Sequence, residues 1–598
     1  MVRRLLHWFV VSIPVIYLLL ALGIVFFIQQ HSYEYILAYY PQHWPTAFDV
    51  TFFARRCLTP QWYAFITGNA LLLETVFVLA LAAYFLLIKT VKKGVQQLLD
   101  DVQWVMMFMK QTLRGLSGRE KWLLLGLFVL TGCYRLYFFV QFPMHPDEAC
   151  SYLFFARQGT FMAAANYVTT NNHILLNVVC SFLAKLSFLG PKWVMRLPAM
   201  VGDIGLLLGI FCLVKHFSHF ARAFWIIAGI AFCYIISYYA TQGRGYQWQE
   251  ICTVVSAGGC WWYFFSPAGG RKKGYGLFIA ASVAGFYLNP LYVYPFLTLM
   301  LAAGYLFLKR KNSAALFSFV KAGTAIVLFT FILYLPLIMA NSWKALVNNE
   351  FISGHQHISA LASKVEVGNA IFAFNYGVNY GSAGVGILMA GLIFSLVLYY
   401  RRIVKGDYYR MMLVWLVASF GSFILVTLYQ KVYPLERAMC FWILMVDLVF
   451  LNVLYDCFNR FFPNKAVLLF ALFVSGKALF SMRTIYWSRY AIDKQEQVAI
   501  SHTIKLQFDE LMAMGATTWQ VTNSDDYYSM FLPIYLIEHN KRESIILNRD
   551  RGVADVIFLP DTYQQGFDLN GFILWKDMQV TSQGNCLRVY AKKKLIDR

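Results

Sequence analysis

Two adjacent carboxylates stand in the segment FPMHPDEACSYLFFARQG, residues 142–159, between two strongly apolar stretches. When both are charged, Asp147 and Glu148 oppose each other's ionisation, which raises the pKa of one of them and makes it a candidate general base. A second interpretation needs no chemistry, because Pro146 followed by acids is a common start of a helix. The residues by themselves leave both interpretations open.

Three later segments place polar or charged residues at the edges of apolar stretches. They read TTNNHILLNVV, YYATQGRGYQWQE and LYQKVYPLERAM, and their candidate binding residues are Asn172, His173, Arg244, Tyr246, Lys431, Tyr433 and Arg437. A histidine in such a place is also explained as a polar cap, and Lys or Arg often anchors a helix end at a membrane boundary. The same cations suit a phosphate group, which arginine binds through two parallel hydrogen bonds.

Histidines add candidate ligands for a metal. His145, His173, His355 and His357 are compatible with a divalent metal together with Glu148, but their spacing matches no common ligand pattern. The eleven cysteines stand singly without a CxxC pair, which favours small buried side chains over disulfides or a zinc site. A divalent metal therefore stays an open alternative.

The composition indicates a membrane protein. Of the 598 residues, 59% are hydrophobic and only 14% are charged, and apolar runs long enough for about 20 residues to cross a bilayer recur along the chain. Backbone groups in lipid need partners within their own segment, so the runs are expected to be helices. The net charge of +21 comes mainly from short clusters between the runs, which mark topology rather than nucleic-acid binding.

Thirteen membrane spans are predicted, with the N-terminal MVRR in the cytoplasm and the first run retained as an anchor. They lie near 5–28, 64–88, 122–142, 197–214, 223–240, 248–265, 275–289, 291–308, 314–338, 382–400, 411–429, 438–457 and 465–482. This arrangement puts 23 Lys and Arg residues in inner segments and 11 in outer ones. A crossing at 172–190 would reverse the later clusters, so that segment is predicted to be half embedded in a long outer loop, 143–196.

Charged residues inside the predicted spans are costly and need partners. They are Glu74, Arg135, Asp203, Lys321 and Asp447. An ion pair of Arg135 with Asp203 or Asp447 is the structural explanation that we expect.

The chain is expected to be an all-α polytopic membrane bundle, in the cell (inner) membrane, with a small C-terminal extracytoplasmic α/β domain. Two N-terminal spans and a basic cytoplasmic linker occupy 1–121, the catalytic core occupies 122–484, and the outer domain occupies 485–598. In the last region TTWQVTN, ESIILN, ADVIFLP and CLRVYAK are typical of strands, and 494–514 and 525–540 of helices.

Taken in chain order, the polar segments resemble the GT-C superfamily of membrane glycosyltransferases, in the branch of protein O-mannosyltransferases and lipid A aminoarabinose transferases. The family's acidic pair is matched by HPDEA, and its N-H-P-P-L-Y-like pattern by NNHILLN, which lacks the prolines. An R-L-P-S-like start of a span corresponds to MRLPAMVGDIGLLLGIF, a Y-S-Q-E-A-R-x-Y-like turn to YYATQGRGY, and a Y-P-x-R-like stretch to YPLERAM. The resemblance covers 122–482 and departs from the family at Asn289, where relatives tend to carry histidine.

The resemblance implies an inverting glycosyltransferase that moves a sugar from a polyprenyl-phosphate donor to an acceptor hydroxyl outside the membrane. Asp147 would act as base, Glu148 would orient the sugar or tune Asp147, and Arg437 would bind the phosphate with help from Lys431 and Arg244. A departing lipid phosphate needs little protonation at neutral pH, so one base and one cation suffice. The acceptor would be a glycan, a lipid or a protein, and membrane lipids are the other partners.

Other functions stay open at this point. A transporter or lipid flippase typically shows repeats and broken helices, and the sequence contains no convincing pair of halves. A glycan ligase or polymerase would use a diphosphate-linked carrier, and a non-catalytic scaffold would use the outer domain to bind a partner.

Overall fold

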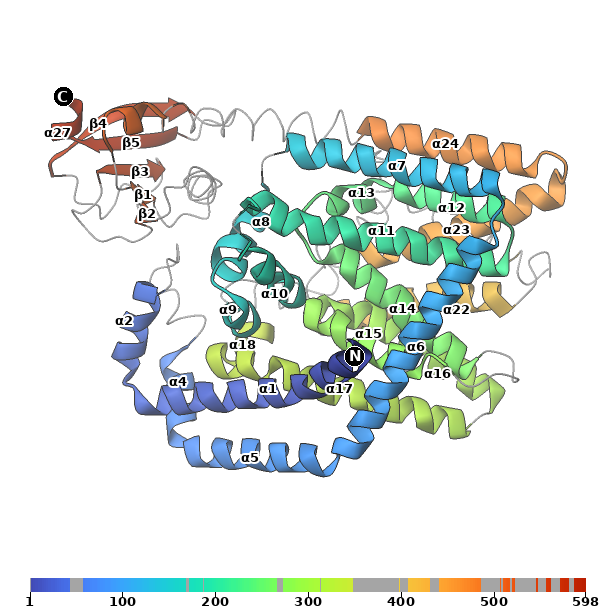
Figure 1. The fold of residues 1–598 in the computed structure, drawn as a ribbon, viewed down its shortest axis with the longest axis horizontal. Helices are drawn as coiled ribbons and strands as arrows, with labels where there is room; N and C mark the ends of the chain where they lie inside the picture. Colours follow the sequence, from blue (N-terminus) through green and yellow to red (C-terminus); the bar gives the residue numbers. More distant parts are fainter. Residues whose placement is uncertain are drawn as a thin grey trace.

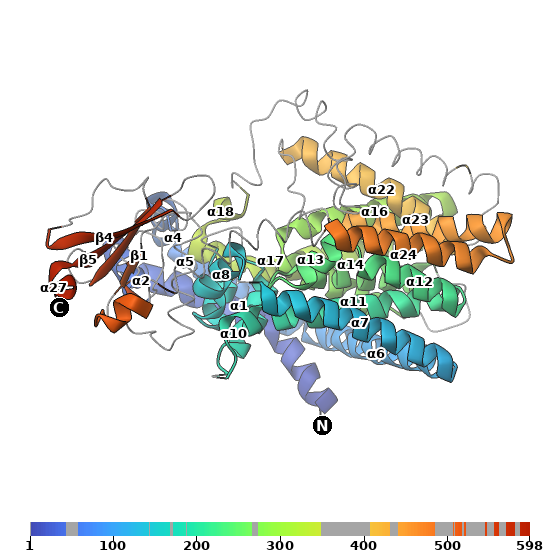
Figure 2. The same ribbon diagram turned by 90° about the horizontal axis from the view of Figure 1, so that it is seen from above.

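A computed structural model of the chain describes most of the bundle and parts of the C-terminal region. The described residues are 2–43, 58–142, 144–167, 172–186, 188–265, 273–311, 313–347, 397, 407–430, 440–484, 506, 509–516, 519–521, 545–546, 555–560, 570–579 and 586–597. They form a helical bundle and a small sheet that lies beyond the end of the bundle at which helix α8 is found (Figures 1 and 2).

The N-terminal helices pack along one side of the bundle (Figure 1). They are α1 Val2–Gln30, α2 Tyr33–His43, α4 Pro60–Gly68, α5 Ala70–Leu86 and the long α6 Ile88–Arg114. Helix α1 lies against α17, Ser313–Asn341, and the Trp62 indole donates to the Met339 carbonyl at 3.2 Å. The two extra predicted helical spans are therefore part of the bundle.

The remaining helices form the body of the bundle and its short outer segments. They are α7 Gly118–Gln141, α8 Pro146–Ser151, the π-helix η1 Tyr152–Ala156, α9 Thr160–Ala165, α10 Ile174–Leu183, α11 Pro191–Phe217, α12 Phe220–Ala231, α13 Tyr234–Ala240, α14 Tyr246–Phe264, α15 Tyr275–Leu288, the 3₁₀ turn η2 Pro290–Tyr292, α16 Val293–Arg310, α18 Trp343–Val347, α22 Asp407–Gln430, α23 Cys440–Phe461 and α24 Ala466–Thr484.

Seven helices among the described residues are long and apolar enough to cross a membrane, or nine if each of two bent pairs counts as one crossing. The bent pairs are α4–α5, at 69°, and α12–α13, at 68°, so the predicted spans 64–88 and 223–240 are each interrupted by a bend. The predicted span 275–289 corresponds to the 14-residue α15, and 411–429 lies within the 24-residue α22, whose apolar part is Leu413–Tyr429. The span at 382–400 lies outside the described residues, apart from one residue, and thirteen crossings stay a prediction.

Helix α10 lies in the segment 172–190, which was predicted to stay in the outer loop. It has 10 residues, and at about 1.5 Å per residue it is too short for a hydrocarbon core of about 30 Å. A full crossing by this helix is therefore excluded by length.

Two buried ion pairs join α7 to α11 and α23 to α24. Arg135 of α7 meets Asp203 of α11 with 2.8 Å between Nε and Oδ2, which confirms the predicted pair. Asp447 of α23 pairs instead with Lys477 of α24 at 2.5 Å. In both pairs each charge has an opposite charge beside it, which offsets part of the cost of burying it in a low-dielectric interior.

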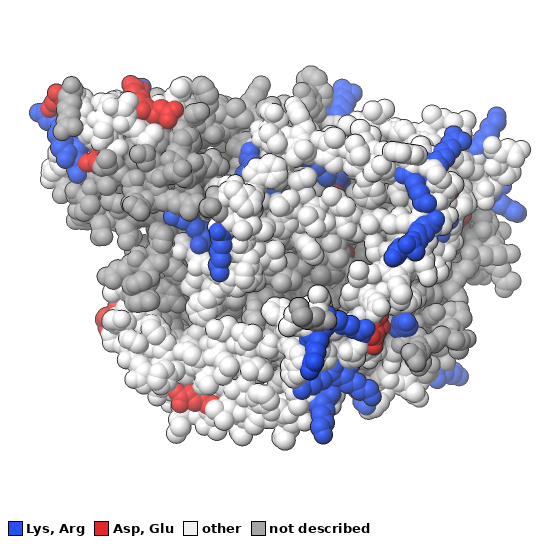
Figure 3. All heavy atoms as spheres, in the orientation of Figure 1, with Lys and Arg blue, Asp and Glu red and all other residues white. Residues whose placement is uncertain are grey.

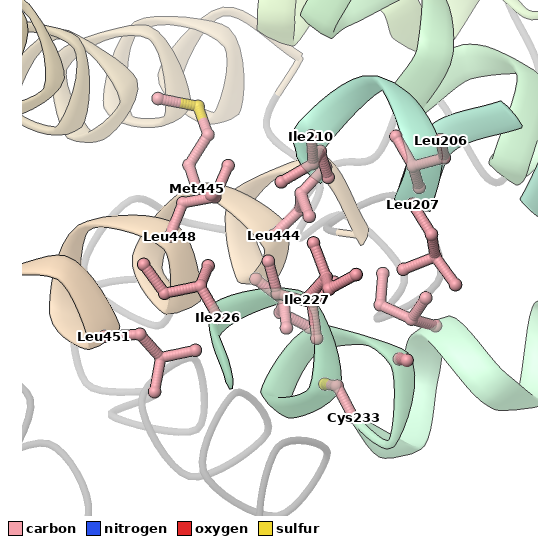
Figure 4. Packing of buried hydrophobic residues seen from close by; sticks show 14 of the residues in the cluster. Leu206, Leu207, Ile210, Ile226, Ile227, Cys233, Leu444, Met445, Leu448 and Leu451 are labelled. Atoms are coloured by element: carbon pink, nitrogen blue, oxygen red, sulfur yellow. The ribbon is translucent and has the colours of Figure 1, made fainter. Parts of the chain in front are cut away.

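The largest buried cluster lies where α11, α12 and α23 meet (Figure 4). It combines aromatic side chains with aliphatic ones, among the latter Leu206, Leu207, Ile210, Ile226, Ile227, Leu444, Met445, Leu448 and Leu451. Since lipid is as apolar as these side chains, close packing rather than exclusion of water holds such helices together. This core fixes α11 and α12, which lie next to the polar segments around α8 and residues 241–245.

Lys and Arg side chains gather around the start of α1 and α6 and where α6 meets α7 and α23 meets α24 (Figure 3). These regions lie at the side of the bundle away from α8 (Figure 1). Which side of the membrane these clusters face, like the orientation of the termini, stays a prediction.

The described part of the C-terminal region forms a five-stranded sheet in the order β2-β1-β3-β5-β4. Its strands are β1 Trp519–Val521, β2 Ile545–Ile546, β3 Val556–Pro560, β4 Phe572–Gln579 and β5 Cys586–Lys592, followed by the short helix α27 Lys593–Ile596. β1 is parallel to β2 and β3, whereas β5 is antiparallel to β3 and β4. Strand β4 was not predicted, and its register shift between Leu574 and Lys576 interrupts the alternation by which strands are recognised.

Candidate functional site

The acidic pair forms the first turn of α8. The Asp147 N–H donates to His145 Nδ1 at 3.2 Å, and the His145 N–H donates to Glu148 Oε2 at 2.7 Å, which together make a capping box with Pro146 in the first turn. Because Nδ1 accepts a hydrogen bond, neutral His145 carries its proton on Nε2. The helix-start interpretation is therefore correct for the backbone, and it leaves the two carboxylates in different surroundings.

Glu148 is completely buried against Arg196 of α11. Arg196 Nε donates to Oε1 at 2.9 Å and Nη2 donates to Oε2 at 2.6 Å, a two-pronged contact, while both residues are at most 1% exposed. Burial acts to raise the pKa of Glu148, but the charge of Arg196 and the hydrogen bonds from Arg196, Gly243 and His145 outweigh it and lower that pKa. Glu148 is thus held as an anion whose oxygens already accept hydrogen bonds.

Arg196 also joins two other parts of the chain. Its Nη1 donates to the carbonyls of Phe139 at 2.8 Å and Phe142 at 3.1 Å, which lie at the end of α7. These are carbonyls that a helix end leaves without helical partners. A single guanidinium therefore fastens α7, α8 and α11 together. Arg196 was not among the predicted site residues, although it lies in the segment MRLPAMVGDIGLLLGIF. The available signal was a positive charge near the start of an apolar run, which needs a partner.

The turn between α13 and α14, residues 241–245, approaches Glu148 from the other side. The Gly243 N–H donates to Glu148 Oε1. A Cβ on Gly243 would lie 2.5 Å from the Met195 Cβ, and a Cβ on Gly245 would lie 2.8 Å from His173 Nδ1. The two glycines are therefore needed for the close approach of this turn to α11 and to His173.

The same turn brings Arg244 to Asp147. Arg244 Nη1 lies 3.3 Å from Asp147 Oδ2, and the aspartate side chain is 21% exposed whereas that of the arginine is 3% exposed. The Arg244 guanidinium also lies 5.7 Å from the centre of the Tyr246 ring. Burial acts to lower the pKa of Arg244, but Asp147, Tyr246 and Tyr239 outweigh it and raise that pKa. Asp147 is thus the accessible carboxylate of the pair, beside a buried cation.

His173 lies behind Tyr246. The two rings meet edge to face with 5.0 Å between their centres, and His173 Nδ1 is 3.5 Å from the amide nitrogen of Asn289. Asn289 is the position at which the chain departs from the pattern of the family that it resembles. Here its side-chain oxygen accepts from the Leu291 N–H at 2.9 Å, so it also starts the 3₁₀ turn η2.

Asn172 connects the start of α10 to the end of α9. Its amide donates to the carbonyls of Ala163 at 3.1 Å and Asn166 at 2.6 Å, and its oxygen accepts from Asn177 at 2.8 Å. The residue is 1% exposed. These contacts give Asn172 a structural role, and its predicted contact with a substrate stays a prediction.

Among the predicted site residues, the structure thus brings together those from three separate segments. They are His145, Asp147, Glu148, Asn172, His173, Arg244 and Tyr246. Lys431, Tyr433, Arg437, His355 and His357 lie outside the described residues. No group of three or more His, Cys, Asp or Glu side chains in the described part of the chain is arranged to hold a metal ion.

In comparisons with known proteins, no family model, no curated protein and no solved structure matches this chain.

Proposed function

We propose that the chain is a membrane glycosyltransferase that transfers a sugar from a polyprenyl-phosphate donor to an acceptor hydroxyl on the extracytoplasmic face. The observation that carries this proposal is the difference between the two acids. Glu148 is buried and fully engaged by Arg196, whereas Asp147 is partly exposed and lies beside Arg244. Such an arrangement offers one reactive carboxylate on a rigid support.

In the proposed reaction the acceptor oxygen attacks the anomeric carbon of the donor while the bond from that carbon to the phosphate oxygen breaks. Asp147 takes the proton of the acceptor hydroxyl, as a general base within hydrogen-bond reach does. The lipid phosphate leaves as an anion and needs little protonation at neutral pH. One displacement at the anomeric carbon inverts its configuration.

Arg244 and Glu148 have supporting roles in this proposal. Arg244 holds Asp147 in place and supplies positive charge near the site where a phosphate anion develops. Glu148 keeps α8 in place through Arg196, so it positions Asp147 rather than contacting the sugar. Arg437 and Lys431 are proposed as further phosphate ligands.

The test is sugar transfer from polyprenyl-phosphate donors by the purified chain in lipid vesicles. Asp147→Asn is expected to lower the rate by at least about a hundredfold, the usual size of a general-base contribution. Asp100→Asn is the matched control, because Asp100 is an exposed carboxylate paired with Arg3 in another part of the chain. Turnover of Asp147→Asn equal to that of the control would remove Asp147 as the base. A preference for diphosphate-linked carriers would instead favour a glycan ligase or polymerase.

One observation favours a second candidate, a transporter or lipid flippase. The two bent helix pairs, and the buried charges beside α12 and α13, are features that transporters use near the middle of the membrane. Proton-coupled uptake of a solute or lipid by vesicles that show no sugar transfer would support this function over the enzyme.

A further inference from the structure

The bend between α12 and α13 leaves polar backbone groups inside the bundle. Helix α12 ends at Ala231, and the last four carbonyls of a helix have no partner within it. Phe232 N–H donates to the Ala228 carbonyl at 3.2 Å and Cys233 N–H donates to the Ile230 carbonyl at 2.9 Å. The carbonyls of Gly229 and Ala231 therefore need other donors.

Two buried cations supply these donors from two different helices. Lys477 Nζ of α24 donates to the Gly229 carbonyl at 3.3 Å, and Arg135 Nη2 of α7 donates to the Ala231 carbonyl at 3.0 Å. Ser237 of α13 adds a hydrogen bond to the Ala231 carbonyl at 2.8 Å. Positive charge is favourable at the C-terminal end of a helix, where the helix dipole is negative.

Each of these cations also has its own carboxylate. Arg135 pairs with Asp203 and Lys477 pairs with Asp447. The carboxylates neutralise the cations, which would otherwise be expensive inside the bundle. The two pairs thus hold the broken end of α12 from two sides without leaving net charge there.

The bend is directly connected to the candidate site. Beyond it, α13 has 7 residues and leads into the turn 241–245. This turn donates the Gly243 N–H to Glu148 and places Arg244 beside Asp147. Because the turn follows directly on the last residue of α13, a change in the direction of α13 displaces the turn.

We infer that Arg135 and Lys477 are positioning residues: by capping the broken end of α12 they fix the direction of α13 and thereby hold Arg244 against Asp147. The placement of the turn follows from the contacts alone. The consequence for sugar transfer rests on the proposed function.

The test removes one cation together with its carboxylate, so that no unpaired charge is left behind. The variant is Arg135→Met with Asp203→Asn, and the matched control is Arg222→Met with Asp456→Asn. Arg222 and Asp456 form a pair with 2.9 Å between Nη1 and Oδ1 at the start of α12, far along the helix from the bend. Both variants lose one ion pair whose arginine contacts α12, since Arg222 belongs to its first turn and Arg135 of α7 donates to its last carbonyl. Only the first variant leaves the Ala231 carbonyl without its guanidinium.

Two readouts are measured on the full chain in lipid nanodiscs. Hydrogen exchange of the peptide covering 238–246 is expected to become at least about tenfold faster in the Arg135 variant and to stay unchanged in the control, since the Gly243 amide loses its place at Glu148. In the transfer assay the Arg135 variant is expected to lower kcat by about a hundredfold, as for a misplaced catalytic group. When the same substitutions are made in an Arg244→Ala background, the further loss is expected to be much smaller, because the contact that they disturb is already absent.

Equal exchange in the variant and its control would overturn the inference, whatever the activity. Faster exchange without any sugar transfer by the wild type would support the positioning role and refute the proposed function. Arg135→Lys keeps the positive charge and a hydrogen-bond donor, so hydrogen exchange in this variant is expected to be as slow as in the wild type. This single variant also provides a test if the double variant does not fold. Failure of this conservative variant to restore slow exchange would also refute the capping role.

Discussion

The buried pair of Glu148 and Arg196 makes a strong prediction about stability. In Glu148→Gln the guanidinium of Arg196, itself 1% exposed, loses its counter-ion while it stays buried. The two carboxylate oxygens accept hydrogen bonds from Arg196, from the Gly243 N–H and from the His145 N–H. A glutamine offers only one oxygen, and its NH₂ group then faces donors.

The size of the effect follows from this loss. Removing one partner of a buried ion pair costs about 3–5 kcal/mol, because the other charge stays uncompensated. Arg196→Met combined with Glu148→Gln removes both charges and is expected to recover part of that loss. The released carbonyls of Phe139 and Phe142 prevent complete recovery, since Arg196 donates to both.

The assay is equilibrium unfolding in mixed micelles of mild detergent and SDS. Glu120→Gln is the matched control, because Glu120 occupies the same place in the capping box of α7 and accepts from the Ser117 N–H at 2.8 Å without a buried arginine. Its substitution is expected to cost no more than about 1 kcal/mol. Equal losses for Glu148→Gln and Glu120→Gln would refute the reasoning, since the ion pair would then contribute nothing beyond the cap.

Two further predictions concern the same region. Burial acts to raise the pKa of Glu148, but Arg196 and the N–H donors outweigh it and lower that pKa. The ionised carboxylate therefore stabilises the folded protein fully above the ordinary carboxyl pKa of about 4.3, and this stabilisation is lost as the pH falls through the lowered native value. The free energy of unfolding should fall more steeply with acid for the wild type than for Glu148→Gln, and parallel curves would contradict this. Gly243→Ala is expected to displace the turn and to reduce the rate of sugar transfer by at least about tenfold, because the added Cβ would lie 2.5 Å from the Met195 Cβ. Gly132→Ala is the control, since nothing lies within 4 Å of its added carbon, and it should leave the rate unchanged. Similar rates in the two variants would show that the turn tolerates the shift.

Local sequence patterns offered the helix start at Pro146 as one of two interpretations, and an ion pair of Arg135 with Asp203 or Asp447, of which the structure shows Asp203. Both expectations depend on residue type and on the cost of charge in lipid. These patterns did not predict that Glu148 would form an ion pair with Arg196. The two residues are 48 positions apart, and their contact depends on how α8 packs against α11. The sequence also gives no sign of the bend after Ala231, where neither glycine nor proline occurs between α12 and α13. Cations from other helices stabilise that bend, so it is a tertiary feature.

The position of Arg196 in the chain sets an order for assembly during synthesis. The acidic helix emerges first, and its counter-ion arrives only with α11, while the Gly243 amide follows after α12 and α13 have been made. A nascent chain that stops before Pro191 therefore carries Glu148 with no cation from α11 to receive it. The candidate site reaches its final form only when α13 and α14, on either side of the turn 241–245, have been inserted. Until then the earlier membrane helices exist without the contacts that complete the site.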